Sequence, residues 1–190
     1  GEVKDEELEN LRGLTAIREL ELRELGISDR AFRHIAGLKT LRKLNFWGTQ
    51  VGDEAFSHVK NLTELEWLAM PSKSTDRGME NLKGLTKLKF LHMALNGGIT
   101  AKGAEHLASL PSLTDLVAHI TNLDDAALIH IGKIASLEGL DLDRTRITDQ
   151  GLKHLYGLRN LKSVAVSQTR VTEAGANELM KEIPLCKVQK

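Results

Sequence analysis

The sequence predicts an α/β solenoid, a single elongated domain over residues 1–190 in which strand–turn–helix units stack on one another. The first observation is a hydrophobic strand pattern that recurs at spacings of 24, 24, 23, 25, 24 and 24 residues. A period of about 20–50 residues is typical of repeat proteins, in which each unit contacts only its neighbours. The units open at Ile17, Leu41, Leu65, Leu88, Leu113, Leu137 and Leu161.

The frame divides the chain into a partial N-terminal repeat (1–16), seven repeats (17–184) and a C-terminal half-repeat (185–190). Residues 3–14 match the second half of a repeat, so the chain begins in mid-repeat at Gly1. We therefore expect a preceding segment to have been removed, whether a targeting signal, an anchor or further repeats. The compartment is not predicted.

The second observation is the pattern inside one unit. After Leu137, the side chains of Leu140 and Leu142 alternate to one face, as expected of a short strand. Asp149 is expected to cap the helical segment that follows, with Thr148 beside it. Apolar residues then recur at helical spacing, at Leu152, Leu155 and Leu158.

The turn after each strand has its own preferred residue. Thr or Asn occupies this position in five units, at Thr49, Asn96, Thr121, Thr145 and Thr169. Leu25 stands there in the first unit, which we therefore expect to be irregular.

These units resemble bacterial leucine-rich repeats of the form LxxLxLxxTxVTDxGLxxLxxLxx over essentially the whole chain. The segment IPLCKV at residues 183–188 is similar to the terminal half-repeat of that subtype, so the natural C-terminus is expected to be present. The resemblance implies a right-handed curved solenoid with a parallel sheet on the concave side and short helices on the convex side. Fold alone says little about function.

Composition narrows the function. Lys plus Arg equal Asp plus Glu at 26 each, which gives no electrostatic reason to expect nucleic acid or an anionic membrane as partner. Cys186 is the only cysteine, and no apolar run is long enough to insert in a membrane. The motifs of hydrolases, nucleotide-binding loops and zinc proteases are absent, so we predict neither an enzyme nor a cofactor.

Histidines recur at one position of the repeat. No carboxylate or cysteine recurs beside them to complete a zinc site, so a structural row is predicted and no metal site. The row consists of His34, His58, His106, His130 and His154.

The outward strand positions depart from a uniform polar surface. Both tryptophans of the chain, Trp47 and Trp67, fall on this face, and Trp67 shares a column with Phe90 on the next strand. At about 150–250 Å² per aromatic side chain, the patch reaches the upper range for a monomer surface, about 300–600 Å². The predicted partner-binding residues are Trp47, Trp67, Phe90, His92, Leu95, Val117, His119 and Ile120.

Two length changes lie beside this patch. The third unit is one residue short near residues 71–74, and the fourth is one residue long near residues 95–98. Both follow the strand, at the same rim of the predicted sheet. Insertions in repeat proteins often map to a binding face.

Three functions stay open on the sequence. The leading one is a non-enzymatic module that binds a protein or peptide through the aromatic patch. The alternatives are a substrate-recognition arm of a larger complex, such as a ubiquitin-ligase-like adaptor or effector, and a carbohydrate or small-molecule receptor. Self-association, or cover by a preceding segment, would also explain an apolar patch on this face.

Overall fold

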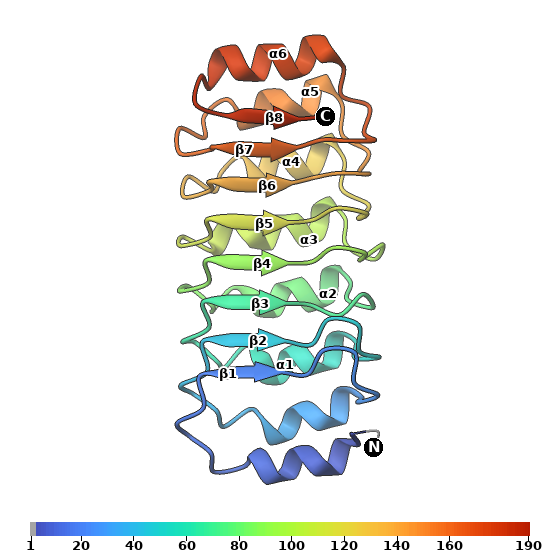
Figure 1. The fold of residues 1–190 in the computed structure, drawn as a ribbon, viewed down its shortest axis with the longest axis vertical. Helices are drawn as coiled ribbons and strands as arrows, with labels where there is room; N and C mark the ends of the chain where they lie inside the picture. The colour runs from blue at the N-terminus through green and yellow to red at the C-terminus, as the bar shows by residue number, and fades with distance from the viewer. Residues whose placement is uncertain (1–2) are drawn as a thin grey trace.

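The computed structural model describes residues 3–190, which form one stack of repeats (Figure 1). Eight parallel strands make a single sheet in chain order, each strand hydrogen-bonded only to its neighbours. Every strand starts two residues after the hydrophobic residue that opens its unit. The strands are β1 (Glu19–Glu21), β2 (Lys43–Asn45), β3 (Trp67–Ala69), β4 (Phe90–His92), β5 (Asp115–Val117), β6 (Gly139–Asp141), β7 (Ser163–Ala165) and β8 (Lys187–Gln189).

Helical segments cover the other face of the sheet (Figure 1). The α-helices are α1 (Phe56–Val59), α2 (Asp76–Met79), α3 (Ala101–Glu105), α4 (Asp125–Ile131), α5 (Asp149–Leu152) and α6 (Glu173–Glu182). The 3-10 segments are η1 (Asp5–Leu11), η2 (Asp29–His34), η3 (Asp53–Ala55), η4 (Glu80–Leu82), η5 (His106–Ser109) and η6 (Lys153–Leu155).

The helical segments are short for a geometric reason. Parallel strands lie about 4.8 Å apart, whereas packed helices need about 8–10 Å between axes. The stack therefore curves with the sheet on the concave side, and single turns or narrower 3-10 segments fill most of the convex side. Among the described residues, α6 is the longest helical segment, at 10 residues. The predicted solenoid is confirmed.

At the N-terminus, η1 occupies the helix position of a repeat, and β8 at the C-terminus pairs with β7. Residues 1–2 of the expected partial repeat lie outside the described residues. Between residues 3 and 190, no helix combines the length and the apolar character needed to cross a membrane.

One hydrophobic core runs through the stack between sheet and helices. Phe32 and Phe56 on the helical side are fully buried, as is Phe46 directly after β2. The ring of Phe46 lies 4.8 Å from that of Phe32 in the preceding repeat and 5.6 Å from that of Phe56 in its own repeat, so two repeats share one aromatic contact. Met70, Met79, Met93 and Leu152 are likewise buried, as expected.

The turn position works as the sequence indicates. The Thr49 hydroxyl donates to the Phe46 carbonyl at 2.7 Å, and the other predicted Thr and Asn side chains make the same bond three residues back. In the shortened third repeat, Ser74 donates to the Pro71 carbonyl at 2.8 Å. Leu25 has no such group, and only its backbone N–H reaches Leu22, at 3.3 Å.

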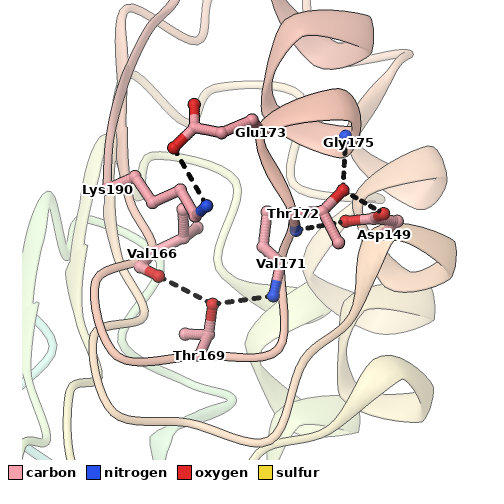
Figure 2. A network of polar contacts seen from close by, with 8 residues as sticks. All are labelled: Asp149, Val166, Thr169, Val171, Thr172, Glu173, Gly175 and Lys190. Atoms are coloured by element: carbon pink, nitrogen blue, oxygen red, sulfur yellow. Dashed lines mark hydrogen bonds and ion pairs between the residues drawn. The ribbon is translucent and has the colours of Figure 1, made fainter.

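Capping differs from the prediction. Thr148, not Asp149, caps α5, and its hydroxyl accepts from the Gln150 N–H at 3.2 Å. Asp149 points instead to the next repeat, where its carboxylate accepts from the Thr172 N–H at 2.8 Å and from the Thr172 hydroxyl at 2.7 Å (Figure 2). The prediction that Asp149 caps its own segment is therefore wrong, because the carboxylate links neighbouring repeats.

This carboxylate link recurs along the convex side, and we call it the Asp ladder. It joins Asp5 to Ser28, Asp29 to Gly52, Asp53 to Thr75, Asp76 to Thr100, Asp125 to Thr148 and Asp149 to Thr172. Ala101 interrupts it, and there the next cap is Asp124, whose own side chain accepts from the N–H groups of Ala126 and Ala127 at 3.1 and 3.3 Å. A self-sufficient cap thus stands where no carboxylate arrives from the preceding repeat.

The ladder also explains the glycine of the repeat. A Cβ built on Gly151 would lie 2.2 Å from Asp125 Oδ1, and one on Gly175 would lie 2.0 Å from Asp149 Oδ1. At these two positions a glycine leaves room for the carboxylate, whereas Ala55 occupies the equivalent position beside Asp29 and donates its N–H to Asp29 Oδ1 at 2.9 Å.

Candidate functional site

The concave face is the surface formed by strand side chains that point away from the helices. On it, Trp67 in β3 is paired in register with Phe90 in β4, and Phe90 with Asp115 in β5. The rings of Trp67 and Phe90 are parallel, with centroids 5.1 Å apart. The predicted contact between these two side chains is therefore present, because the in-register pairing of parallel strands brings equivalent positions together.

A cationic side chain lies over each tryptophan ring. Lys43 Nζ lies 5.1 Å from the centroid of Trp67, and the guanidinium carbon of Arg23 lies 5.1 Å from that of Trp47. Such contacts contribute about 0.5–1 kcal/mol at exposed positions. Because both cations come from the preceding repeat, they hold the indole rings in place from the N-terminal side.

A hollow of about 300 Å³ opens between the two indoles. Ala69 forms part of its floor, and this small side chain leaves the space that a larger residue would fill. We call it the aromatic hollow; its lining is Arg23, Asn45, Trp47, Trp67, Ala69 and His92. Pro71 and Ala94, which lie just beyond the ends of β3 and β4, are buried and add nothing to the surface.

A histidine pair borders the hollow on its C-terminal side. His92 meets Trp47 edge-on at 6.4 Å and His119 edge-on at 6.0 Å between ring centroids. His119 Nδ1 lies 2.8 Å from Asp141 Oδ2. Burial, followed by the charge of His119, lowers the pKa of His92 below its ordinary value, whereas Asp141 acts in the opposite direction. His92 is therefore neutral at pH 7.

Two nitrogens near the hollow have no hydrogen-bond partner within residues 3–190. They are Trp47 Nε1 and His92 Nδ1, and both are buried. Unpaired buried donors and acceptors are costly and uncommon in folded chains.

The eight predicted binding residues do not form one cluster. Trp47, Trp67 and His92 line the aromatic hollow, and Phe90 stacks against it. Val117 lines a second hollow that Phe90 shares, and His119 with Ile120 lines a third.

Leu95 lies outside all three hollows. It is 40% exposed, in the loop after β4, with a left-handed φ of 63°. Ile120 occupies the equivalent position one repeat later, 37% exposed with φ 56°, a conformation that β-branched residues rarely adopt. These two side chains form a rim beyond the strand ends.

Four residues at the aromatic hollow are missing from the predicted binding residues: Arg23, Lys43, Asn45 and Ala69. The signal that could have found Lys43 is its column, since it pairs in register with Trp67. Arg23 precedes Trp47 by 24 residues, one repeat. The small size of Ala69 between two tryptophans was a further indication.

Metal and thiol chemistry find no support on the described part of the chain. Residues 3–190 contain no group of three or more His, Cys, Asp or Glu side chains that could hold a metal ion. The histidine row runs from buried His34 to exposed His154, as a convex-side feature. Burial raises the pKa of the Cys186 thiol, so it is protonated at neutral pH.

Solved structures of two bacterial proteins share this architecture. A family model described as a leucine-rich repeat matches residues 84–108. An internalin C2 from Listeria monocytogenes superposes with a TM-score of 0.68 at 23% identity, covering 88% of this chain and 77% of that one. The chain has the leucine-rich repeat fold.

A leucine-rich repeat protein of Leptospira interrogans gives the same TM-score of 0.68 at 19% identity. The match covers 96% of this chain but only 51% of that protein, so this chain spans about half its length. No curated protein sequence matches the chain. At these identities, the likeness establishes the leucine-rich repeat architecture alone.

Proposed function

We propose that this leucine-rich repeat chain is a non-enzymatic module that binds a protein partner on its concave face. The aromatic hollow receives an apolar side chain of the partner, and Phe90 extends the apolar surface toward β5. Leucine-rich repeat proteins generally act in protein–protein interaction, which supports this class of function. Aromatic side chains flanked by charged groups are also enriched among the residues that dominate binding energy.

The stacked pair of Trp67 and Phe90 carries the proposal. Two large apolar rings lie 5.1 Å apart and half-exposed on the strand surface. A partner that covers them removes apolar surface from water, which lowers the free energy. Their parallel arrangement and the cation over Trp67 fix the rings before a partner arrives. A preorganised surface loses less conformational entropy on binding.

The test is affinity capture from a lysate of the source organism, quantified by mass spectrometry. The bait is wild type beside a Trp67→Ala, Phe90→Ala variant shown to be folded by circular dichroism. We expect at least one protein to be enriched by wild type and lost from the variant, with Trp67→Ala alone costing about 2 kcal/mol or more of affinity for it.

The matched control removes exposed apolar side chains elsewhere. Ile129, 44% exposed on α4, and Leu185, 82% exposed, are each replaced by alanine. This control must capture the same protein as wild type. Equal capture by the Trp67→Ala, Phe90→Ala variant would contradict the proposal.

A further inference from the structure

The two halves of the concave face differ in how their carboxylates are neutralised. In the N-terminal half, Glu21 Oε1 lies 2.8 Å from Lys43 Nζ and Glu66 Oε2 lies 2.7 Å from Lys89 Nζ. These acidic groups already have cationic partners within the chain. These ion pairs keep the net charge around the aromatic hollow close to zero.

The C-terminal half carries three aspartates with no such partner. Among residues 3–190, Asp115, Asp141 and Asp143 form no ion pair with Lys or Arg, and Asp141 meets only the imidazole of His119. Arg144 stands at the rim of the neighbouring hollow, beyond the strand end. The floor of this half therefore presents three carboxylates that no Lys or Arg of the described residues holds in an ion pair.

This charge surrounds a hollow that is continuous with the aromatic surface. A space of about 280 Å³ is lined by Phe90, Asp115, Asp141 and Asp143, with the small residues Gly139 and Ser163. A Cβ on Gly139 would lie 2.6 Å from Asp115 Oδ1, so the absence of a side chain there makes room for the carboxylate. We call this the acidic hollow. Phe90 lines it and stacks on Trp67, which lines the aromatic hollow, so the two hollows lie side by side across this aromatic pair. We refer to the two hollows and the aromatic pair together as the groove.

We propose that this groove takes a polypeptide segment in which an apolar or aromatic residue is followed by Lys or Arg three or four residues away. The apolar side chain enters the aromatic hollow, and the basic one extends over Phe90 to the carboxylates. This inference rests on the proposed function and names the chemistry of its partner.

The spacing follows from the sheet. Trp67 and Asp115 occupy one column two strands apart, and Asp141 lies on the strand after that. At about 4.8 Å per strand, the carboxylates lie about 10–14 Å from the aromatic hollow. An extended peptide advances about 3.3 Å per residue, so three to four residues span that distance.

The charge also sets the expected strength of the effect. A Lys or Arg head held between unpaired, half-buried carboxylates is screened less by salt than a fully exposed pair. We therefore expect binding to weaken at high ionic strength without being abolished, since the aromatic contact remains.

The experiment is selection of a random dodecapeptide library displayed on phage, against four immobilised proteins. They are wild type, Trp67→Ala with Phe90→Ala, Asp115→Asn with Asp141→Asn, and a control with Glu105→Gln and Glu182→Gln. The control removes the same charge from exposed positions away from the concave face. Asn at residue 141 retains an oxygen for the Asp143 N–H, which now donates to Asp141 Oδ1 at 3.0 Å.

We expect wild type and control to enrich peptides with an apolar residue and a Lys or Arg at the stated spacing. The aromatic variant should lose this enrichment. The Asp115→Asn, Asp141→Asn variant should bind a synthetic consensus peptide at least about tenfold more weakly than the control does, as expected when a close charge pair is lost.

The failures are distinguishable. Peptides that need Trp67 and Phe90 but show no excess of Lys or Arg, or that bind the Asp115→Asn, Asp141→Asn variant as tightly as wild type, would overturn this inference and leave the proposed function standing. Peptides retained by the aromatic variant, or a wild-type dimer in sedimentation that buries the groove and prevents any enrichment, would overturn both.

Discussion

The convex and concave sides of this solenoid follow opposite rules. On the convex side, one carboxylate link recurs from Asp5 to Thr172, and the single interruption at Ala101 is matched by a self-capping Asp124. On the concave side, neighbouring repeats share a backbone position but little chemistry, since one column runs from Lys43 through Trp67 to Asp115. The residues that recur in each repeat link neighbouring repeats to one another. The residues that differ from repeat to repeat give the concave face its varied chemistry.

Two phenylalanines give the sharpest contrast. Phe46 is fully buried between the rings of Phe32 and Phe56, whereas Phe90 is half-exposed on the concave face. We expect Phe46→Ala to lower the free energy of unfolding by about 3–5 kcal/mol. Phe90→Ala should cost about 1.5 kcal/mol or less, the stacking contribution. Urea unfolding followed by circular dichroism measures both, and equal losses would remove the distinction between the two faces.

The glycine of the repeat tests the Asp ladder. Gly151→Ala places a Cβ 2.2 Å from Asp125 Oδ1, so the carboxylate must shift away from the geometry in which it accepts from the Thr148 N–H at 2.7 Å. We expect a loss of about 1–3 kcal/mol of stability, the cost of unsatisfied buried polar groups. The control is Gly157→Ala, because nothing lies within 4 Å of a Cβ there. Gly157→Ala should leave stability unchanged or raise it slightly, because alanine lowers the entropy of the unfolded chain. A loss as large as that of Gly151→Ala would show that the effect does not come from the ladder.

The interruption of the ladder should behave as a coupled pair. Ala101→Asp alone brings a second carboxylate toward Asp124 and should destabilise the chain by about 0.5–1 kcal/mol. Adding Asp124→Thr rebuilds the usual Asp–Thr link and should recover most of that loss. A double-mutant cycle measures the coupling free energy, and strictly additive effects would mean that the two positions are independent.

The smallest expected effect is the pH dependence that His92 contributes. Its pKa is lower in the folded chain than its ordinary value of 6.5, so the unfolded chain binds the proton more tightly. Its contribution to stability is therefore complete above pH 6.5 and decreases as the pH falls through that value toward the folded pKa. His119, Asp141 and Trp47 face the ring.

The measurement is urea unfolding at pH 7.5, 6.5 and 5.5 for wild type and His92→Gln. Wild type should lose more stability across this range than the variant does. Identical pH profiles would mean that folding does not lower the pKa of His92.

The sequence was sufficient for the architecture because the repeat spacing and the in-register pairing fix each other. Once units are aligned, the contact between Trp67 and Phe90 follows without coordinates. The role of Asp149 did not follow, because Thr-Asp at a helix start satisfies local capping logic equally well, and its partner Thr172 lies 23 residues away. An argument from the local sequence considers only the backbone groups at the start of the same helix.

The same limit applies to the binding surface. That Arg23 and Lys43 lie over indole rings depends on side-chain rotamers, which a strand pattern does not specify. Leu95 was grouped with the aromatic residues because it follows β4, but a left-handed residue beyond the strand turns the side chain to the rim. Alternation of faces predicts direction only inside a strand.

The most direct test of the account uses adjacent residues on opposite faces of β3, Trp67 and the fully buried Leu68. Partner capture and urea unfolding are measured on the same preparations of Trp67→Ala and Leu68→Ala. The account predicts that Leu68→Ala loses about 2–5 kcal/mol of stability while its folded fraction still captures the partner. Trp67→Ala should stay within about 1.5 kcal/mol of wild type and lose the capture. Capture of the same protein by Trp67→Ala at wild-type levels would contradict the central claim that the concave aromatic surface is the binding site.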